Sequence, residues 1–321
     1  MKQPLGRSGI EVAPLAFGGN VFGWTADEHT SFAMLDRFVA AGCNLIDTAD
    51  VYSKWIPGHT GGESEAILGR WLQRRGRRDD VVIATKVGME MAPAEKGLSR
   101  AYILAAAERS LQRLQTDYID LYQAHIDDPA TPLEETLGAF AELIAAGKVR
   151  AIGASNYEPE RLAAALEVSA AHGLPRFETL QPWYNLYDRV AFEGPPAELC
   201  RAKQLGVISY FGLASGFLTG KYRKEQDYAN SARGYRVKTM LNERGLRILA
   251  ALDTVAAEYG ATPAQVSLAW LRARGVTAPI ASATSVAQLE ELLPSAELDL
   301  DAAAVAVLNA ASEGGEPPPR W

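Results

Sequence analysis

Four residues whose side chains can hold or transfer a proton follow short apolar runs of the chain. Asp47 ends the run that begins at Asn44, and Tyr52 lies five positions further on. Lys86 ends the run that begins at Val81, and His125 closely follows another run. Taken singly, each has an ordinary structural role, such as a turn cap for Asp47 or a solvated loop residue for Lys86. Their common position at the ends of successive runs favours a single site instead.

The chemistry open to this set is proton donation to a carbonyl oxygen. A buried carboxylate is costly without a cation, so Asp47 requires a partner, which Lys86 can supply. A phenol with a pKa near 10 is a poor acid at neutral pH, and we expect the Lys86 ammonium to lower the pKa of Tyr52. We expect His125 to hydrogen-bond the substrate oxygen. No side chain donates a hydride, and metal-ligand spacings are absent from the sequence, so a nicotinamide cofactor is the simplest electron source.

The second half of the chain carries residues suited to such a cofactor. Ser155 and Asn156 follow the run 149–153, and Gln181 ends the run 178–181. Their hydroxyl and amide groups suit a carboxamide, and Tyr210 offers a flat face to a nicotinamide ring. Residues 212–222 combine three glycines with Lys221, which suits a pyrophosphate, and residues 282–285 lead into a helix N-terminus that suits a phosphate. The expected cofactor residues are Ser155, Asn156, Gln181, Tyr210, Phe211, Gly212, Leu213, Ser215, Gly216, Lys221, Arg233, Ser282, Thr284, Gln288 and Glu291.

Alternating strands and helices must position these residues. Eight runs read as strands, and they are residues 15–18, 44–46, 81–84, 118–122, 149–153, 178–181, 206–210 and 278–280. Segments with helical spacing separate or follow them, namely residues 28–41, 63–74, 101–114, 133–146, 159–172, 196–205, 242–259, 262–274, 285–292 and 301–312. The pattern predicts an α/β fold, a (β/α)₈ TIM barrel with an N-terminal β-hairpin and extra C-terminal helices. A doubly wound sheet would need a GxGxxG turn, which residues 17–20 lack.

In such a barrel the active site lies at the C-terminal ends of the strands, where the candidate residues fall. We expect one domain over residues 1–321, with residues 314–321 as a loose tail. Phe22, Trp24 and Trp55 follow the first two strands and predict an aromatic substrate mouth. The long charged loop 223–238 is a candidate lid over the cofactor.

Composition narrows the compartment and the partners. A net charge of -7 and a pI near 5.3 argue against nucleic acid as a partner. The two cysteines are far apart and lack a CxxC spacing, which favours a reducing compartment. The N-terminus lacks a signal-like apolar run, and no stretch is apolar for the length of a membrane span. We therefore expect a cytoplasmic protein acting on a small molecule; its oligomeric state is not readable from the sequence.

An ordered set of motifs resembles the aldo-keto reductase family along essentially the whole chain. The matching segments are Asp47-Thr48-Ala49 with Tyr52, Glu63-Ser64-Glu65 with Leu68-Gly69, Ala84-Thr85-Lys86, Asp117 to Leu121 with His125, Gly147 to Asn156, Gln181 to Asn185 and Leu218 to Tyr222. The resemblance implies an NADP(H)-dependent reductase of aldehydes, ketones or sugar-like substrates. It further implies that Tyr52 is the general acid of a tetrad with Asp47, Lys86 and His125. Ser155, Asn156 and Gln181 would then hold the carboxamide, with Tyr210 stacked on the ring.

Departures from the family pattern affect the cofactor. Family members often continue from the strand-seven aromatic with Ser-Pro, where this chain has Phe211-Gly212. Many members carry a basic residue near the adenosine 2'-phosphate where this chain has Ser282 or Gln288, and the frequent Glu-Asn pair reads Glu291-Leu292. Lys221 and Arg233 remain to meet the phosphate. We expect NADP(H), with NAD(H) as the alternative.

Other functions stay open on the sequence alone. A cofactor-binding regulatory subunit that senses redox state, with little turnover, would use the same fold and the same residues. A metal-dependent sugar isomerase on this barrel would need clustered carboxylates and histidines at the strand ends, where the chain places one histidine.

Overall fold

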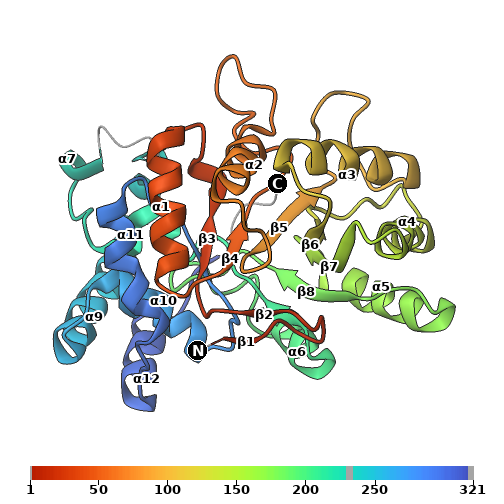
Figure 1. The fold of residues 1–321 in the computed structure, drawn as a ribbon. Coiled ribbons are helices and arrows are strands. Elements are labelled where there is room, and N and C mark those ends of the chain that lie inside the picture. Colours follow the sequence, from red (N-terminus) through yellow and green to blue (C-terminus); the bar gives the residue numbers. More distant parts are fainter. Residues whose placement is uncertain (1, 229–233, 317–321) are drawn as a thin grey trace.

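Eight parallel strands form the centre of the computed structural model, which describes residues 2–228 and 234–316 (Figure 1). The strands are β3 (Ala16–Gly18), β4 (Leu45–Asp47), β5 (Val82–Val87), β6 (Ile119–Ala124), β7 (Val149–Ser155), β8 (Phe177–Gln181), β9 (Gly206–Val207) and β10 (Ile280–Ala281). Their order is β10-β3-β4-β5-β6-β7-β8-β9. Backbone hydrogen bonds from Ala278 to Val207 and from Ile280 to Ser209, 3.2 and 2.9 Å long, join the two ends of this order. The predicted (β/α)₈ barrel is confirmed.

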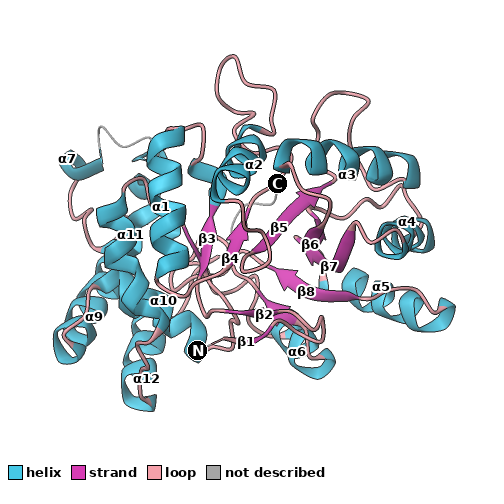
Figure 2. Cartoon of the chain, in the orientation of Figure 1, coloured by secondary structure: helices cyan, strands magenta, loops and turns pink. Residues whose placement is uncertain are grey.

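Helices surround the strands (Figure 2). They are α1 (Glu28–Ala40), α2 (Glu63–Arg75), α3 (Arg100–Leu114), α4 (Leu133–Ala145), α5 (Pro159–His172), α6 (Pro195–Lys203), α7 (Glu225–Tyr228), α8 (Gly234–Met240), α9 (Glu243–Tyr259), α10 (Pro263–Ala273), α11 (Val286–Leu292) and α12 (Ala302–Ala311), with 3₁₀ turns η1 (Gly19–Val21), η2 (Ala214–Thr219) and η3 (Leu293–Ala296). Local signals fix several starts: Thr262 and Gln265 form a capping box, and Asp301 caps α12. None of these helices is long and apolar enough to cross a membrane, within the ranges described above.

The predicted N-terminal hairpin is present as β1 (Gln3–Pro4) paired antiparallel with β2 (Glu11–Val12), and it lies at the N-terminal ends of the barrel strands (Figure 1). Leu5, Ile10 and Val12 are buried with side chains of the barrel interior such as Leu45 and Leu121. The contact is close at Gly6, where an added Cβ would lie 2.3 Å from the carbonyl oxygen of Glu178. The hairpin therefore closes the lower end of the barrel, and polar side chains gather at the other end.

The segment 223–238 differs from the loop that the sequence predicts. Its described residues include α7 and the first five residues of α8, and α8 packs against η2. Few apolar residues mark these helices, and α7 has no buried residue, so periodicity did not reveal them. Residues 229–233 and 317–321 lie outside the described residues, and residues 313–316 form neither helix nor strand.

Candidate active site

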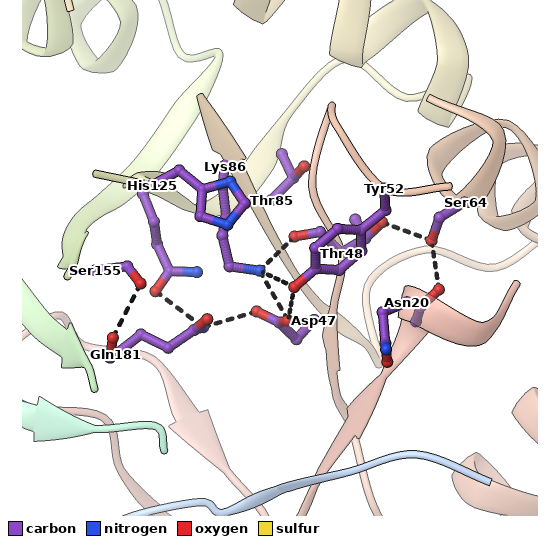
Figure 3. A network of polar contacts seen from close by, with 12 residues as sticks. Asn20, Asp47, Thr48, Tyr52, Ser64, Thr85, Lys86, His125, Ser155 and Gln181 are labelled. Atoms are coloured by element: carbon purple, nitrogen blue, oxygen red, sulfur yellow. Dashed lines mark hydrogen bonds and ion pairs between the residues drawn. The ribbon is translucent and has the colours of Figure 1, made fainter. Parts of the chain in front are cut away.

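Neighbouring strands bring the four proton-handling residues to one end of the barrel (Figure 3). Asp47 is the last residue of β4 and lies level with Ala84 of β5, two residues before Lys86. His125 directly follows β6, and its backbone N–H donates to the carbonyl of Val87. Because the strands are parallel and in register, these side chains meet although they are far apart in sequence.

Lys86 joins Asp47 to Tyr52. Its Nζ lies 2.8 Å from Asp47 Oδ2, 2.9 Å from the Tyr52 hydroxyl and 2.7 Å from the carbonyl oxygen of Thr48. The Tyr52 hydroxyl also lies 3.2 Å from Asp47 Oδ2. Lys86 is fully buried and Asp47 is 1% exposed, so the ammonium and the carboxylate compensate each other away from water. The predicted partnership between Asp47 and Lys86 is confirmed.

The pKa of Tyr52 shifts in the direction opposite to our expectation. Burial, and then the negative charge of Asp47 beside the hydroxyl, hold the pKa of Tyr52 well above its usual value of 10.0. Burial also lowers the pKa of Lys86, which Asp47 raises in part. The sequence does not show how deeply Tyr52 is buried, and this burial raises its pKa more than the Lys86 ammonium can lower it. Tyr52 is consequently held protonated, the form that an acid requires.

His125 is a neutral imidazole in this site. Burial, followed by the charge of Lys86, holds the pKa of His125 well below 6.5. Its ring centroid lies 6.1 Å from that of Tyr52, and its Nδ1 is buried without a hydrogen-bond partner among the described residues. An uncharged ring beside the phenol can hydrogen-bond a substrate oxygen without competing for the proton of Tyr52.

Gln181 and Ser155 end neighbouring strands on the far side of the barrel. The Ser155 hydroxyl donates to the backbone carbonyl of Gln181 at 2.9 Å. The Gln181 amide nitrogen lies 2.8 Å from Asp47 Oδ1 and 3.4 Å from Gln123 Oε1. Gln181, which we expect to hold a cofactor carboxamide, therefore also contacts Asp47 directly.

Asn156 connects His125 to Tyr210. Its amide nitrogen donates to the His125 carbonyl at 2.9 Å and contacts Ser155 Oγ at 3.1 Å, while its Oδ1 accepts from the Tyr210 hydroxyl at 2.7 Å. Asn156 adopts a left-handed backbone with φ of 56°, which asparagine tolerates better than most residues. The expected carboxamide residues thus lie together at the barrel mouth.

The segment from Phe211 to Gly216 turns tightly through several left-handed residues. Phe211, Ala214, Ser215 and Gly216 all have positive φ, whereas Leu213 has φ of -105° and ψ of 17°. A right-handed residue followed by a left-handed one can turn successive N–H groups into a concave nest. Two N–H groups are engaged in turns, those of Ala214 and Gly216. Lys221 lies over this loop, since a Cβ added at Gly216 would be 3.7 Å from its Nζ. The arrangement fits a pyrophosphate.

Aromatic side chains and α8 cover the same loop. The Phe211 ring lies 4.6 Å from that of Trp183, and the Arg236 guanidinium lies 4.8 Å over Phe211. Phe211, at the departure from Ser-Pro, thus provides a platform for α8. Sequence reasoning missed Trp183 and Arg236, although Trp183 stands two residues after Gln181.

The remaining cofactor candidates are less enclosed. Thr284 and Gln288 are exposed, and Gln288 Oε1 accepts from both the N–H and the hydroxyl of Thr284. Ser282 donates to Asn20 at 2.7 Å, which ties β10 to the turn after β3. Glu291 is exposed, and Arg233 lies outside the described residues.

The expected aromatic mouth is present in part. Trp55 is 48% exposed, and its ring centroid lies 5.7 Å from that of Trp24 and 6.1 Å from that of Tyr52. Phe22 is fully buried and stacks on Phe17 at 5.3 Å. The expectation that Phe22 lines the mouth is therefore wrong, because its ring points into the core between sheet and helices.

A second buried polar group behind Lys86 was missed. Asp50 is 2% exposed with neither carboxyl oxygen bonded among the described residues, and burial first, then Glu65, raises its pKa to about 8. Glu65 is fully buried and accepts from Thr85 at 2.6 Å and from Arg113 at 2.7 Å. The sequence signal was the second carboxylate three residues after Asp47, within an otherwise small and apolar stretch.

Comparisons with known proteins show what the chain as a whole is similar to. The model of the aldo/keto reductase family matches residues 14–313. Protein tas of Escherichia coli (strain K12) is 34% identical over 330 residues, covering 95% of each chain. The uncharacterized oxidoreductase YrpG of Bacillus subtilis (strain 168) is 36% identical over 325 residues, covering 98% of this chain and 97% of the relative. A probable voltage-gated potassium channel subunit beta of Oryza sativa subsp. japonica is 34% identical over 296 residues, covering 89% and 88%.

Proposed function

Because the chain belongs to the aldo/keto reductase family and is thus an oxidoreductase, we propose that it reduces the carbonyl group of an aldehyde, ketone or sugar-like small molecule with NADPH, and catalyses the reverse oxidation. The observation that carries this proposal is the buried contact of Lys86 with both Asp47 and the Tyr52 hydroxyl. A phenol in that contact is built to release and recover one proton.

Tyr52 acts as the general acid in the reducing direction. A nicotinamide cofactor held at the barrel mouth would supply the hydride that the carbonyl carbon receives. The carbonyl oxygen takes the proton of Tyr52. The resulting phenolate accepts the hydrogen bond that Lys86 already donates to this oxygen, over 2.9 Å. Asp47 keeps the ammonium oriented, and neutral His125 donates a hydrogen bond to the substrate oxygen. Since the pKa of Tyr52 is raised, reduction proceeds at neutral pH and oxidation requires more alkaline solution.

The residues that would hold the cofactor lie on the other side of the mouth. Ser155, Asn156 and Gln181 suit its carboxamide, and Tyr210 suits its ring. The nest at residues 211–216 with Lys221 suits its pyrophosphate. The preference for NADP(H) over NAD(H) rests on the family resemblance, with Lys221 and Arg233 as the candidate cations.

Loss of NADPH absorbance with a panel of aldehydes, ketones and sugars tests this function. We expect turnover that falls by about 10³-fold in Tyr52→Phe with little change in cofactor affinity. The same assay with NADH measures the cofactor preference. Absence of turnover on every compound, or equal turnover in Tyr52→Phe, would falsify the proposal.

A second candidate follows from the relative in rice that is named as a probable channel subunit beta. In this alternative the chain binds the cofactor and reports redox state to a partner, with little turnover. Tight NADPH binding in calorimetry without turnover, together with a stable complex recovered from cells of the source, would favour it over the reductase.

A further inference from the structure

The Gln181 side chain crosses the barrel to reach Asp47. Strands β8 and β4 stand four places apart in the eight-stranded order, on opposite sides of the barrel. Nevertheless the amide nitrogen of Gln181 lies 2.8 Å from Asp47 Oδ1, and 3.4 Å from the oxygen of Gln123 on β6. Side chains from alternate strands commonly share one layer of such a barrel. Figure 3 shows Gln181 reaching Asp47, which in turn contacts Lys86 and Tyr52.

The chemistry of the partners fixes which end of the Gln181 amide faces Asp47. Asp47 pairs with the Lys86 ammonium at 2.8 Å, so it is a carboxylate and only accepts hydrogen bonds. The amide NH₂ must therefore point at Asp47, and both of its protons have acceptors in the layer. Among the described residues, none donates a hydrogen bond to the amide oxygen of Gln181.

The two carboxylate oxygens of Asp47 therefore have different hydrogen-bond partners. Oδ1 accepts from Gln181, and Oδ2 serves both Lys86 and the Tyr52 hydroxyl, at 2.8 and 3.2 Å. A carboxylate held at one oxygen cannot rotate freely about its bond, so Gln181 determines where the other oxygen stands. Because the site is buried, each hydrogen bond to this charge has a larger effect than in water.

We propose that Gln181 is a positioning residue that couples the cofactor side of the site to the acid Tyr52. Its NH₂ group fixes Asp47, and its oxygen is the acceptor left for a carboxamide N–H. The role of the oxygen rests on the proposed function, whereas the role of the NH₂ group does not. A bond to the oxygen polarises the N–H groups of the same amide and so strengthens their bond to Asp47.

The variant Gln181→Met keeps the length of the side chain and removes both donors. Asp47 then directs more of its negative charge at the phenol, so the electronic environment of Tyr52 changes. We expect weaker cofactor binding and a kcat lower by about tenfold. The matched control is Asn156→Gly, which removes an amide at the cofactor side that does not touch Asp47. Glycine tolerates the φ of 56° at this position.

The experiment uses the full chain labelled with ¹³C at the ζ carbon of its 12 tyrosines. The Tyr52 resonance is assigned by its loss in Tyr52→Phe and recorded without cofactor, and NADPH affinity is measured separately by fluorescence titration. We expect both variants to weaken NADPH binding and only Gln181→Met to move the Tyr52 resonance. An unmoved resonance in a folded Gln181→Met protein overturns the inference.

Two further results separate this inference from the proposed function. If Gln181→Met does not fold, Gln123→Met removes the second acceptor of the Gln181 amide, and a smaller displacement of the Tyr52 resonance is expected; no displacement overturns the inference. If the resonance moves but no carbonyl is ever reduced, the proposed function fails while the Asp47 coupling stands. An active reductase with an unmoved resonance overturns the coupling and leaves the proposed function intact.

Discussion

Two regions of the barrel mouth are built in different ways. The proton region, which consists of Asp47, Tyr52, Lys86 and His125, comes from β4, β5 and β6 and the segments that follow them. Lys86 alone makes three of its polar contacts, each shorter than 3.0 Å. The cofactor region, the loops 211–221 and 282–288 that we propose hold the cofactor phosphates, relies on backbone turns, left-handed residues and a few exposed side chains such as Lys221 and Gln288.

The difference follows from what each region must do. A proton donor must have its neighbours in place before the substrate arrives, because reorganising a buried charge during the reaction is costly. A phosphate, by contrast, brings its own charge and many acceptor oxygens, so backbone N–H groups and one exposed lysine suffice. Substitutions in the proton region should therefore change the rate, and those in the cofactor region should change affinity.

Replacement of Lys86 should have the largest effect. Lys86→Met removes the cation that supports the phenolate and leaves Asp47 buried without its partner. We expect kcat to fall by about 10³-fold and the protein to lose about 3 kcal/mol of stability. Steady-state kinetics and urea unfolding measure the two effects. Lys96→Met, which removes an exposed ion pair to Glu90, is the control and should change neither by more than a small margin. Equal activity in the two variants would contradict the division into two regions.

Asp50 should limit stability at alkaline pH. Its pKa is raised to about 8 in the folded protein, whereas an unfolded aspartate titrates near 4. The folded state therefore binds more protons in this interval, and stability falls as pH rises from about 4 to about 8. Asp50→Asn should equal the wild type near pH 4, and its advantage should grow by about 1.4 kcal/mol with each pH unit up to about pH 8.

Urea unfolding at pH 5, 6, 7 and 8 measures this gain. Asp79→Asn is the control, because Asp79 is 79% exposed and its replacement should give no gain that grows with pH. A difference between Asp50→Asn and wild type that stays constant with pH would show that Asp50 is ionised throughout. In that case Asp50 would be a further buried carboxylate, beside the proton region, whose charge is compensated by its neighbours.

Sequence reasoning succeeded where strand register decides the outcome. The eight strands and the pairing of Asp47 with Lys86 follow from period and position, since parallel strands bring their ends to one face. It failed where depth decides: the raised pKa of Tyr52 and the burial of Phe22 depend on the packing of helices around the sheet. It also missed Gln123, because a contact across the barrel has no local signature, and Asp50, whose place three residues after Asp47 did not reveal how deeply it is buried.

Lys221 should affect affinity more than rate. Lys221→Met removes the ammonium above Gly216, and we expect the Kd for NADPH to rise by about tenfold with kcat at saturating cofactor unchanged. The salt dependence of binding should also become weaker, since one cation is lost. Fluorescence titration at two salt concentrations measures both effects. The control is Lys224→Met, since Lys224 is another exposed lysine of the same loop and its backbone N–H, which the substitution keeps, donates to Asp227. A fall in kcat at saturating cofactor would remove the distinction between the regions.

Trp55 should show the smallest effect. Its ring stands at the rim beside Tyr52 but is 48% exposed, so a substrate can bury only part of it. Trp55→Ala should raise KM for an aromatic aldehyde by about threefold, and hardly change KM for a short aliphatic one, because the lost contact is apolar area. Leu246, equally exposed on α9, gives the matched control Leu246→Ala. If Trp55→Ala lowers kcat for both substrates, the rim helps to hold Tyr52, and the proton region extends to the surface of the mouth.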